Sequence, residues 1–243
     1  MTTPLLDGRR VLVTGASSGI GAATAQTLRK AGARVAVAAR RTDRLDGDLR
    51  LTLDVTDEAA VRAAVGTTVA ELGGLDLVVN AAGLMPLGPV LGADTAQWRR
   101  VLDTNVLGLM LVTHAALPHL LEAAGRGGPA DLVNISSIGG RETFPGSAAY
   151  HASKFAVHGF SDSLRKEVGA SGVRVSLIEP GFVDTELPDS IGDPAIEANV
   201  RQMITGLNRI LDPADVAAAI AHLVAQPAHV LINEFQIRPT AQA

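Results

Sequence analysis

Short apolar runs alternate with longer segments of helical periodicity along almost the whole chain. Most of the short runs are dense in Val, Leu or Ile, as expected for strands that are covered on both faces. The predicted strands are Arg10–Thr14, Arg34–Ala39, Arg50–Leu53, Asp76–Asn80, Asp131–Ser136, Val173–Glu179 and Asn233–Ile237. The predicted helices are Gly19–Ala31, Asp57–Leu72, Thr95–Ala124, Ala148–Ala170 and Pro213–Ala225. This order predicts an α/β fold, with a doubly wound parallel sheet and helices on both faces.

Two helix starts have recognisable signals. Asp212 and Pro213 place a carboxylate at the N-cap and proline at the first helical position, with Asp215 in the first turn. Asp94 followed by Gln97 resembles a capping box. Residues 40–54, by contrast, are too few for a strand and a full crossover helix, so we expect no helix after the second strand.

Length and composition limit the classes of protein that the chain can represent. Its 243 residues fit one domain, and no linker divides them. The net charge of −4 and the lack of a Lys/Arg cluster predict no nucleic-acid partner. Without cysteine, disulfides and thiolate chemistry are excluded. The N-terminus has no signal-peptide pattern, and prolines break the uncharged run Leu77–Ala93, so we expect a soluble cytoplasmic protein that does not enter a membrane.

The first predicted strand is followed by "TGASSGIG", residues 14–21, and then directly by a helix. Glycines at positions 15, 19 and 21 allow a tight turn and a close approach of a pyrophosphate to the backbone. The helix that follows offers unpaired N–H groups and the positive end of its dipole. A glycine-rich turn alone is a weak signal, but its place between the first strand and the first helix predicts a dinucleotide site.

The end of the second strand bears on the choice of dinucleotide. An NAD site requires a carboxylate there for the ribose hydroxyls, but this strand ends with Ala39, followed by Arg40 and Arg41. A guanidinium group binds a phosphate well. The pair therefore favours NADP(H), the alternative being two solvated arginines.

A tyrosine and a lysine lie four residues apart in "YHASK", at Tyr150 and Lys154. They are the only tyrosine and one of three lysines in the chain, and at this spacing they share a helical face. Ser137, at the end of the fifth strand in "NISS", is placed to face them across a cleft, although alone it would be an ordinary turn serine. Asn105 lies inside a helical pattern that disfavours asparagine, which indicates a distortion or a specific hydrogen bond.

Six motifs together resemble the classical short-chain dehydrogenase/reductase family, in order and in spacing, from about residue 8 to the C-terminus. They are "TGASSGIG", "NAAG" (80–83), Asn105, "NISS" (134–137), "YHASK" (150–154) and "PGFVDT" (180–185). The segments "AARR" and "NEFQIRPT" further resemble the NADP-dependent subgroup that contains clavulanate (clavaldehyde) dehydrogenase. The resemblance implies a single Rossmann-type domain over 1–243, with a substrate-loop insertion at about 182–209.

The resemblance also implies a mechanism. Tyr150 would be the general acid/base, Lys154 would hold the nicotinamide ribose and lower the pKa of the phenol, Ser137 would position the carbonyl oxygen, and Asn105 would hold a water molecule in a proton relay. Lowering a phenol pKa from about 10 to near 7 requires about 4 kcal/mol of differential stabilisation, which a nearby ammonium and the oxidised nicotinamide can provide. No metal ion is expected.

The same resemblance assigns residues to the cofactor NADP(H). The assigned residues are Gly15, Ser17, Ser18, Ile20, Gly21, Arg40, Arg41, Asp54, Val55, Asn80, Ala81, Gly83, Tyr150, Lys154, Pro180, Val183 and Thr185. The implied function is hydride transfer between nicotinamide and a small carbonyl or alcohol substrate. The implied assembly is a homotetramer, with a dimer as the alternative. Two alternatives stay open, a 3-oxoacyl-thioester reductase and a non-catalytic NADP-binding regulatory protein. The pocket for the substrate is expected between Met85, the 139–147 loop and residues 182–207.

Overall fold

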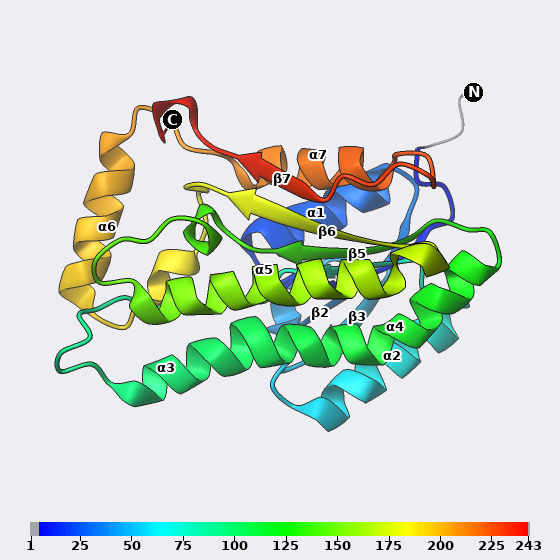
Figure 1. Cartoon of the computed structure of the whole chain (residues 1–243), viewed down its shortest axis with the longest axis horizontal. Helices are drawn as coiled ribbons and strands as arrows, with labels where there is room; N and C mark the ends of the chain where they lie inside the picture. Colours follow the sequence, from blue (N-terminus) through cyan, green and yellow to red (C-terminus); the bar gives the residue numbers. More distant parts are fainter. Residues whose placement is uncertain (1–4, 243) are drawn as a thin grey trace.

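The computed structural model describes residues 5–242, so the ends of the predicted domain, residues 1–4 and 243, lie outside the described residues. Seven strands form one parallel sheet in the order β3-β2-β1-β4-β5-β6-β7 (Figure 1). The strands are β1 (Arg10–Thr14), β2 (Arg34–Ala39), β3 (Leu49–Thr52), β4 (Leu77–Asn80), β5 (Ala130–Ile135), β6 (Val173–Pro180) and β7 (Glu234–Ile237). The predicted fold class is confirmed.

The burial of the strands explains their composition. Every residue of β4 and β6 is buried, whereas the edge strands β3 and β7 alternate between more and less exposed positions. From β1 the chain builds outward through β2 and β3, and then returns to place β4 on the other side of β1. Open α/β sheets bind ligands beyond the carboxyl ends of their strands at such a reversal of strand order.

Helices cover both faces of the sheet (Figure 1). They are α1 (Gly19–Lys30), α2 (Glu58–Leu72), α3 (Thr95–Leu102), α4 (Leu109–Gly125), α5 (Ala148–Val168), α6 (Pro194–Gly206) and α7 (Pro213–Val224). On one face, Leu28 of α1 and Ile220 of α7 pack with Val13 of β1 in one buried cluster. Because β1 and α1 both pack in this cluster, the turn between them is held at its two ends.

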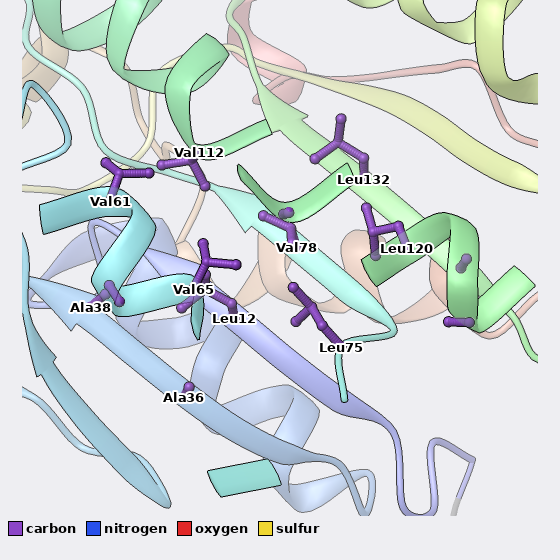
Figure 2. Packing of buried hydrophobic residues seen from close by; sticks show 14 of the residues in the cluster. Leu12, Ala36, Ala38, Val61, Val65, Leu75, Val78, Val112, Leu120 and Leu132 are labelled. Atoms are coloured by element: carbon purple, nitrogen blue, oxygen red, sulfur yellow. The ribbon is translucent and has the colours of Figure 1, made fainter. Parts of the chain in front are cut away.

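The opposite face of the sheet is covered by α2, α4 and α5. Val65 of α2 and Val112 of α4 pack over Leu12 of β1 and Val78 of β4, as Figure 2 shows. All four side chains are at most 2% exposed. The two layers fix β1 and β4 on both sides, so the carboxyl ends of these strands are held rigidly.

Every predicted element recurs within two residues of its observed ends, and the predicted Thr95–Ala124 helix is observed as α3, a π-helical turn and α4 in one continuous helical segment. One helix was missing from the prediction: α6 lies inside the segment that was predicted only as a substrate loop. Its start repeats the signal of α7, because Asp193 caps the helix and Pro194 is its first residue. The signal was therefore present in the sequence.

Capping and loop predictions had different outcomes. The Asp212 cap is confirmed, and Asp215 completes a capping box with it. Asp94 also caps its helix, but the predicted box is wrong, because the Gln97 side chain turns to Arg100 instead. The connection between β2 and β3 contains one short 3₁₀ turn, Thr42–Arg44, so the expected absence of a crossover helix there is confirmed.

The segment Thr95–Gly125 is continuously helical, and by length and composition alone it could cross a membrane. One side of this helical segment packs into the core, because its residues Val112, Ala116 and Leu120 are each at most 1% exposed. Its opposite side leaves Leu107 and Met110 exposed.

Candidate active site

The turn between β1 and α1 is built for close contact with a ligand backbone. Gly15 has φ +65°, and a Cβ there would lie 2.5 Å from the backbone nitrogen of Ala82. A Cβ at Gly21 would lie 2.4 Å from the carbonyl oxygen of Gly15. The first turn of α1 contains no acidic residue, and Ser18 precedes it at the N-cap. This arrangement fits a pyrophosphate, which the N–H groups of a helix start bind well.

A cavity of about 390 Å³ lies above this turn, at the carboxyl ends of the strands. Most of the residues assigned to the cofactor line it: Gly15, Ser17, Ser18, Ile20, Gly21, Arg40, Arg41, Asp54, Val55, Ala81, Gly83, Lys154 and Thr185. Residues far apart in sequence therefore meet in one place, as the family resemblance implied. The glycine-rich turn and the residues gathered around it fit a dinucleotide cofactor.

Four assigned residues do not line this cavity: Asn80, Tyr150, Pro180 and Val183. The side chain of Asn80 is buried between strands, where its Nδ2 donates to Asn134 Oδ1 at 2.9 Å. Asn134 in turn donates to Ser161 Oγ at 2.9 Å. Asn80 thus ties β4 to β5 and α5, and its position at a strand end did not reveal which way its side chain points.

The adenosine side of the cavity contains the arginine pair. Ala39 is buried, and both Arg40 and Arg41 are exposed. Arg41 donates hydrogen bonds to Ser17 Oγ at 3.2 Å and to Ser18 Oγ at 2.9 Å, so its guanidinium lies over the glycine-rich turn. A phosphate bound in this region would meet a permanently cationic group.

Asp54 lies beside the arginine pair and remains ionised. Its carboxylate accepts hydrogen bonds from the backbone N and from Oγ1 of Thr56, at 3.0 and 2.8 Å. The pKa of Asp54 is lowered, first by the bond from the Thr56 backbone and then, more weakly, by the charge of Arg40. The side chain is therefore fixed as an acceptor at the edge of the cavity.

Tyr150 and Lys154 share the face of α5 that turns toward the sheet, and both side chains are 7% exposed. Lys154 Nζ lies 5.8 Å from the centre of the Tyr150 ring and donates to the carbonyl oxygen of Ile135 at 3.0 Å. The predicted pairing on one helical face is thereby observed. The bond to Ile135 fixes the ammonium at the end of β5.

Burial changes the pKa of both groups. It lowers the pKa of Lys154 to about 8. It raises the pKa of Tyr150, and the neighbouring Ser137 side chain opposes this rise. In the protein alone, burial therefore has a larger effect on the phenol pKa than the Ser137 hydrogen bond. The lowered pKa that the resemblance implies includes the charge of the oxidised nicotinamide and stays a prediction.

Ser137 begins a 3₁₀ turn at the end of β5. Its Oγ accepts a hydrogen bond of 3.0 Å from the backbone N of Gly139, which orients the hydroxyl. Gly139 lies next to Tyr150, since a Cβ there would be 3.3 Å from Cε1 of the ring. The serine and the tyrosine therefore approach each other from β5 and α5, as predicted.

Asn105 lies in a π-helical turn, Asp103–Gly108, between α3 and α4. Its Oδ1 accepts from Leu84 N at 2.8 Å, and its Nδ2 donates to Leu84 O at 2.9 Å and to Ser153 Oγ at 3.0 Å. The distortion and the specific hydrogen bonds that the sequence indicated are both present. Such turns frequently mark functional sites. Both amide hydrogens are used within the chain, so the side chain has no donor left for a water molecule.

Ser153 was not predicted, although it belongs to the "YHASK" motif. It is fully buried and donates to the carbonyl oxygen of Tyr150 at 2.6 Å. Its spacing of three from Tyr150 places it on the same helix face. Glu186, which lines the cavity, and its ion-pair partner Arg44 were also missed, since no local pattern indicates this pair.

A second cavity, of about 330 Å³, lies beside the expected substrate region, between the 86–98 segment, Gly146–Ala149 and Ile191–Ile196. Trp98 and several aliphatic side chains line it. Two hydrogen bonds tie the surrounding loops together: Met85 N donates to the side-chain Oγ of Ser190 at 2.8 Å, and Gly88 N donates to the carbonyl oxygen of Gly146 at 2.7 Å. The loops that were expected to enclose the substrate are therefore neighbours.

Comparisons with known proteins agree with this geometry. The family model described as short chain dehydrogenase matches residues 9–195. An uncharacterised oxidoreductase of Staphylococcus haemolyticus is 36% identical, with 96% of this chain and 98% of that protein covered. A serine dehydrogenase complexed with NADP⁺ is similar in structure, with a TM-score of 0.86, 32% identity and 96% of each chain covered.

A third relative bears on one of the open alternatives. A 3-ketoacyl-(acyl-carrier-protein) reductase from Brucella melitensis, complexed with NADH, has a TM-score of 0.87 and 27% identity over 98% of this chain and 100% of that one. Its fold is about as similar to that of this chain as the fold of the serine dehydrogenase is, but its sequence is less similar. On the family model and on relatives that span nearly its whole length, the chain belongs to the short-chain dehydrogenases and is an oxidoreductase.

Proposed function

We propose that the chain is an NADP(H)-dependent oxidoreductase that interconverts a carbonyl and an alcohol. The observation on which this rests is the buried pair Tyr150 and Lys154, one helical turn apart, beside a cavity that fits a dinucleotide. Burial keeps the phenol protonated at neutral pH, because it raises the pKa of Tyr150. A protonated phenol is the form that can donate a proton to a carbonyl oxygen.

When bound, the nicotinamide supplies the hydride. Tyr150 donates its proton to the carbonyl oxygen in reduction, or accepts the proton of the alcohol in oxidation. Ser137 donates a second hydrogen bond to that oxygen and holds it in place. Lys154, held by Ile135 O, presents its charge to the ribose and to the phenol. General acid catalysis of this kind contributes about 10²–10⁴-fold to the rate.

Asn105 acts in this mechanism through its backbone. Its side chain is occupied by Leu84 and Ser153, so a proton-relay water would have to be held by a main-chain group of the π-helical turn. We propose that the side chain maintains the widened turn. The amide bonds to Leu84 would also fix the loop that follows β4, where the cofactor ribose is expected.

The choice of NADP(H) is supported by the end of β2. Ala39 brings no negative charge, and Arg40 and Arg41 bring two positive ones. The related serine dehydrogenase and a metagenomic short-chain oxidoreductase, at 30% identity and a TM-score of 0.80, are both complexes with NADP. We propose that the assigned residues lining the cavity contact this cofactor, and that Pro180 and Val183 contact it through their main chain. The resemblance to the clavulanate dehydrogenase subgroup points to the same cofactor.

The 3-oxoacyl-thioester alternative is less well supported. A carrier protein with an acidic surface would require a basic patch near the cleft. Within the segment 186–206, Arg201 is the single basic residue, and it is paired with Asp189 and Glu197. A regulatory protein without activity would not require Asn105, Ser137, Tyr150 and Lys154 together.

The deciding experiment is NADPH consumption against a panel of ketones, aldehydes, 3-oxoacyl thioesters and, in the reverse direction, serine and simple alcohols. We expect turnover with a ketone or an aldehyde that is lost in Tyr150→Phe. Turnover confined to thioesters would replace the proposal with the alternative. NADPH binding without turnover on any class would favour the regulatory role.

We also propose a homotetramer in the cytoplasm. Exposed apolar side chains lie on the outer side of the 95–125 helix and on α5, at Leu102, Leu107, Met110 and Phe155. Burying such a surface between subunits would be favourable. Sedimentation equilibrium of the wild type and of Met110→Glu tests this, with a smaller assembly expected for the variant.

A further inference from the structure

Glu186 lines the cofactor cavity and forms ion pairs with two arginines. Its Oε2 accepts from Arg41 Nη1 and its Oε1 from Arg44 Nη1, both at 2.8 Å. Both arginines follow β2, whereas Glu186 follows β6. These strands are four spacings apart in the sheet, or about 19 Å at ~4.8 Å per spacing. The contact therefore joins two segments that follow distant strands of the sheet.

One of these two guanidinium groups, that of Arg41, also lines the cavity in which the ribose phosphate is expected. Arg41 is hydrogen-bonded to Ser17 and Ser18 of the glycine-rich turn, and Arg40, Arg41 and Glu186 line one cavity. A carboxylate that accepts from two arginines occupies the donors that a phosphate would use. The hydrogen bond from Arg41 is also the main reason that the pKa of Glu186 is lowered, so the carboxylate is charged at neutral pH.

We propose that Glu186 sets cofactor selectivity by competing with the 2′-phosphate of the cofactor for Arg41 and Arg44. This inference rests on the proposed use of NADP(H). A bound 2′-phosphate displaces the carboxylate from Arg41. The short turn Leu187–Ser190, whose N-cap is Glu186, then loses its tie to the β2 side. Phosphate binding is thereby coupled to release of the segment that leads into α6.

The ion pairs of Glu186 are exposed to solvent, which limits their effect on cofactor binding. The three side chains are between 44% and 48% exposed, and such pairs contribute little in water. Removing Glu186 also removes its repulsion of the phosphate. We therefore expect a gain in selectivity of roughly three- to tenfold, the scale of an exposed pair of charges.

The test compares adenosine 2′,5′-bisphosphate with adenosine 5′-monophosphate, which differ only in the 2′-phosphate and do not reach the nicotinamide end. Calorimetry gives the ratio of their Kd values for the wild type and for Glu186→Gln. We expect the ratio to favour the bisphosphate in the wild type and to rise roughly three- to tenfold in the variant. Asp189→Asn is the control, because Asp189 lines the same cavity but pairs with Arg201; its ratio should stay within about twofold of the wild type.

Hydrogen exchange provides the second readout. In the wild type the bisphosphate, but not the monophosphate, should speed exchange in a peptide spanning residues 185–193. In Glu186→Gln this peptide should exchange fast with or without ligand. A wild-type ratio near one would overturn the proposed cofactor. A wild-type preference that Glu186→Gln leaves unchanged, or that Asp189→Asn raises equally, would overturn the competition and leave the cofactor assignment intact.

Discussion

Asn105 Nδ2 donates a hydrogen bond of 3.0 Å to Ser153 Oγ, and that hydroxyl donates to the backbone of Tyr150 at 2.6 Å. The π-helical turn is thus connected through one buried hydroxyl to the residue that is proposed to transfer the proton. Asn105 and Ser153 are at most 2% exposed, so neither can exchange this link for water. The two helices that flank the cleft are held in register at the site of the chemistry.

Replacing Ser153 with alanine should therefore destabilise the protein. The change leaves an amide hydrogen of Asn105 buried without an acceptor, which costs about 1–3 kcal/mol of unfolding free energy. Ser163→Ala, on the exposed side of the same helix, is the matched control and should change stability by no more than about 0.5 kcal/mol. Urea unfolding measures both; equal losses would mean that the link contributes nothing.

Tyr150→Phe removes the proton donor and preserves the ring that packs in the site. Turnover should fall at least ~10²-fold, within the range of general acid catalysis. NADPH should still bind, since the loss concerns the reacting oxygen and not the cofactor cavity. Steady-state kinetics with fluorescence titration of NADPH separates these effects. Activity within a factor of a few of the wild type would contradict the assigned mechanism.

The pH dependence of NADPH capture should report Lys154. Its pKa of about 8 means that the ammonium is present at pH 7 and is lost as the pH rises. Since kcat/KM reports the free enzyme, its value for NADPH should be flat below about pH 7.5 and fall above about pH 8. Lys154→Arg, permanently charged, should move the fall beyond pH 10 even if the rate is lower. An unmoved profile in that variant would assign the fall to another group.

Gly15 and Gly66 form a contrasting pair for stability. Alanine at Gly15 combines φ +65° with a clash against Ala82, so we expect a loss of at least ~2 kcal/mol together with weakened cofactor binding. Alanine at Gly66, inside α2 with open space around it, should gain about 0.5–1 kcal/mol. Thermal unfolding of both variants checks the signs, and a tolerated Gly15→Ala would show that the turn can relax.

Local patterns were sufficient for the sheet and for most of its helices, because each depends on short-range periodicity and on caps such as Asp212. They were also sufficient to bring Tyr150, Lys154 and Ser137 into one cleft, since strand ends and helix faces follow from topology. These local patterns did not indicate the direction in which a side chain points. Asn80 ends a strand at the cleft, yet its amide turns to Asn134, a partner 54 residues away.

Contacts between distant loops were equally inaccessible from the sequence. Nothing near Arg41 indicates that Glu186, 145 residues later, lies within hydrogen-bond distance. The pKa of the Tyr150 phenol depends on packing in the same way: the sequence shows the nearby ammonium but not the burial, and burial raises this pKa in the protein alone. The helix α6, by contrast, was missed despite a local signal, the Asp193–Pro194 start.

The preference for NADPH over NADH is the sharpest test of the end of β2. Ala39 adds no charge, and Arg40 is exposed beside the expected ribose. Charge-assisted hydrogen bonds to a phosphate contribute roughly 1.5–3 kcal/mol each, so NADPH should be preferred at least ~10-fold in kcat/KM. Because Arg40 is exposed, this preference should shrink with rising salt. Ala39→Asp combined with Arg40→Gln should reverse it, since the new carboxylate would accept bonds from the free 2′-hydroxyl and repel the phosphate. The cofactor preference of Ala39→Asp alone should lie between that of the wild type and that of the double variant. Equal use of both cofactors by the wild type would show that the arginines only face solvent.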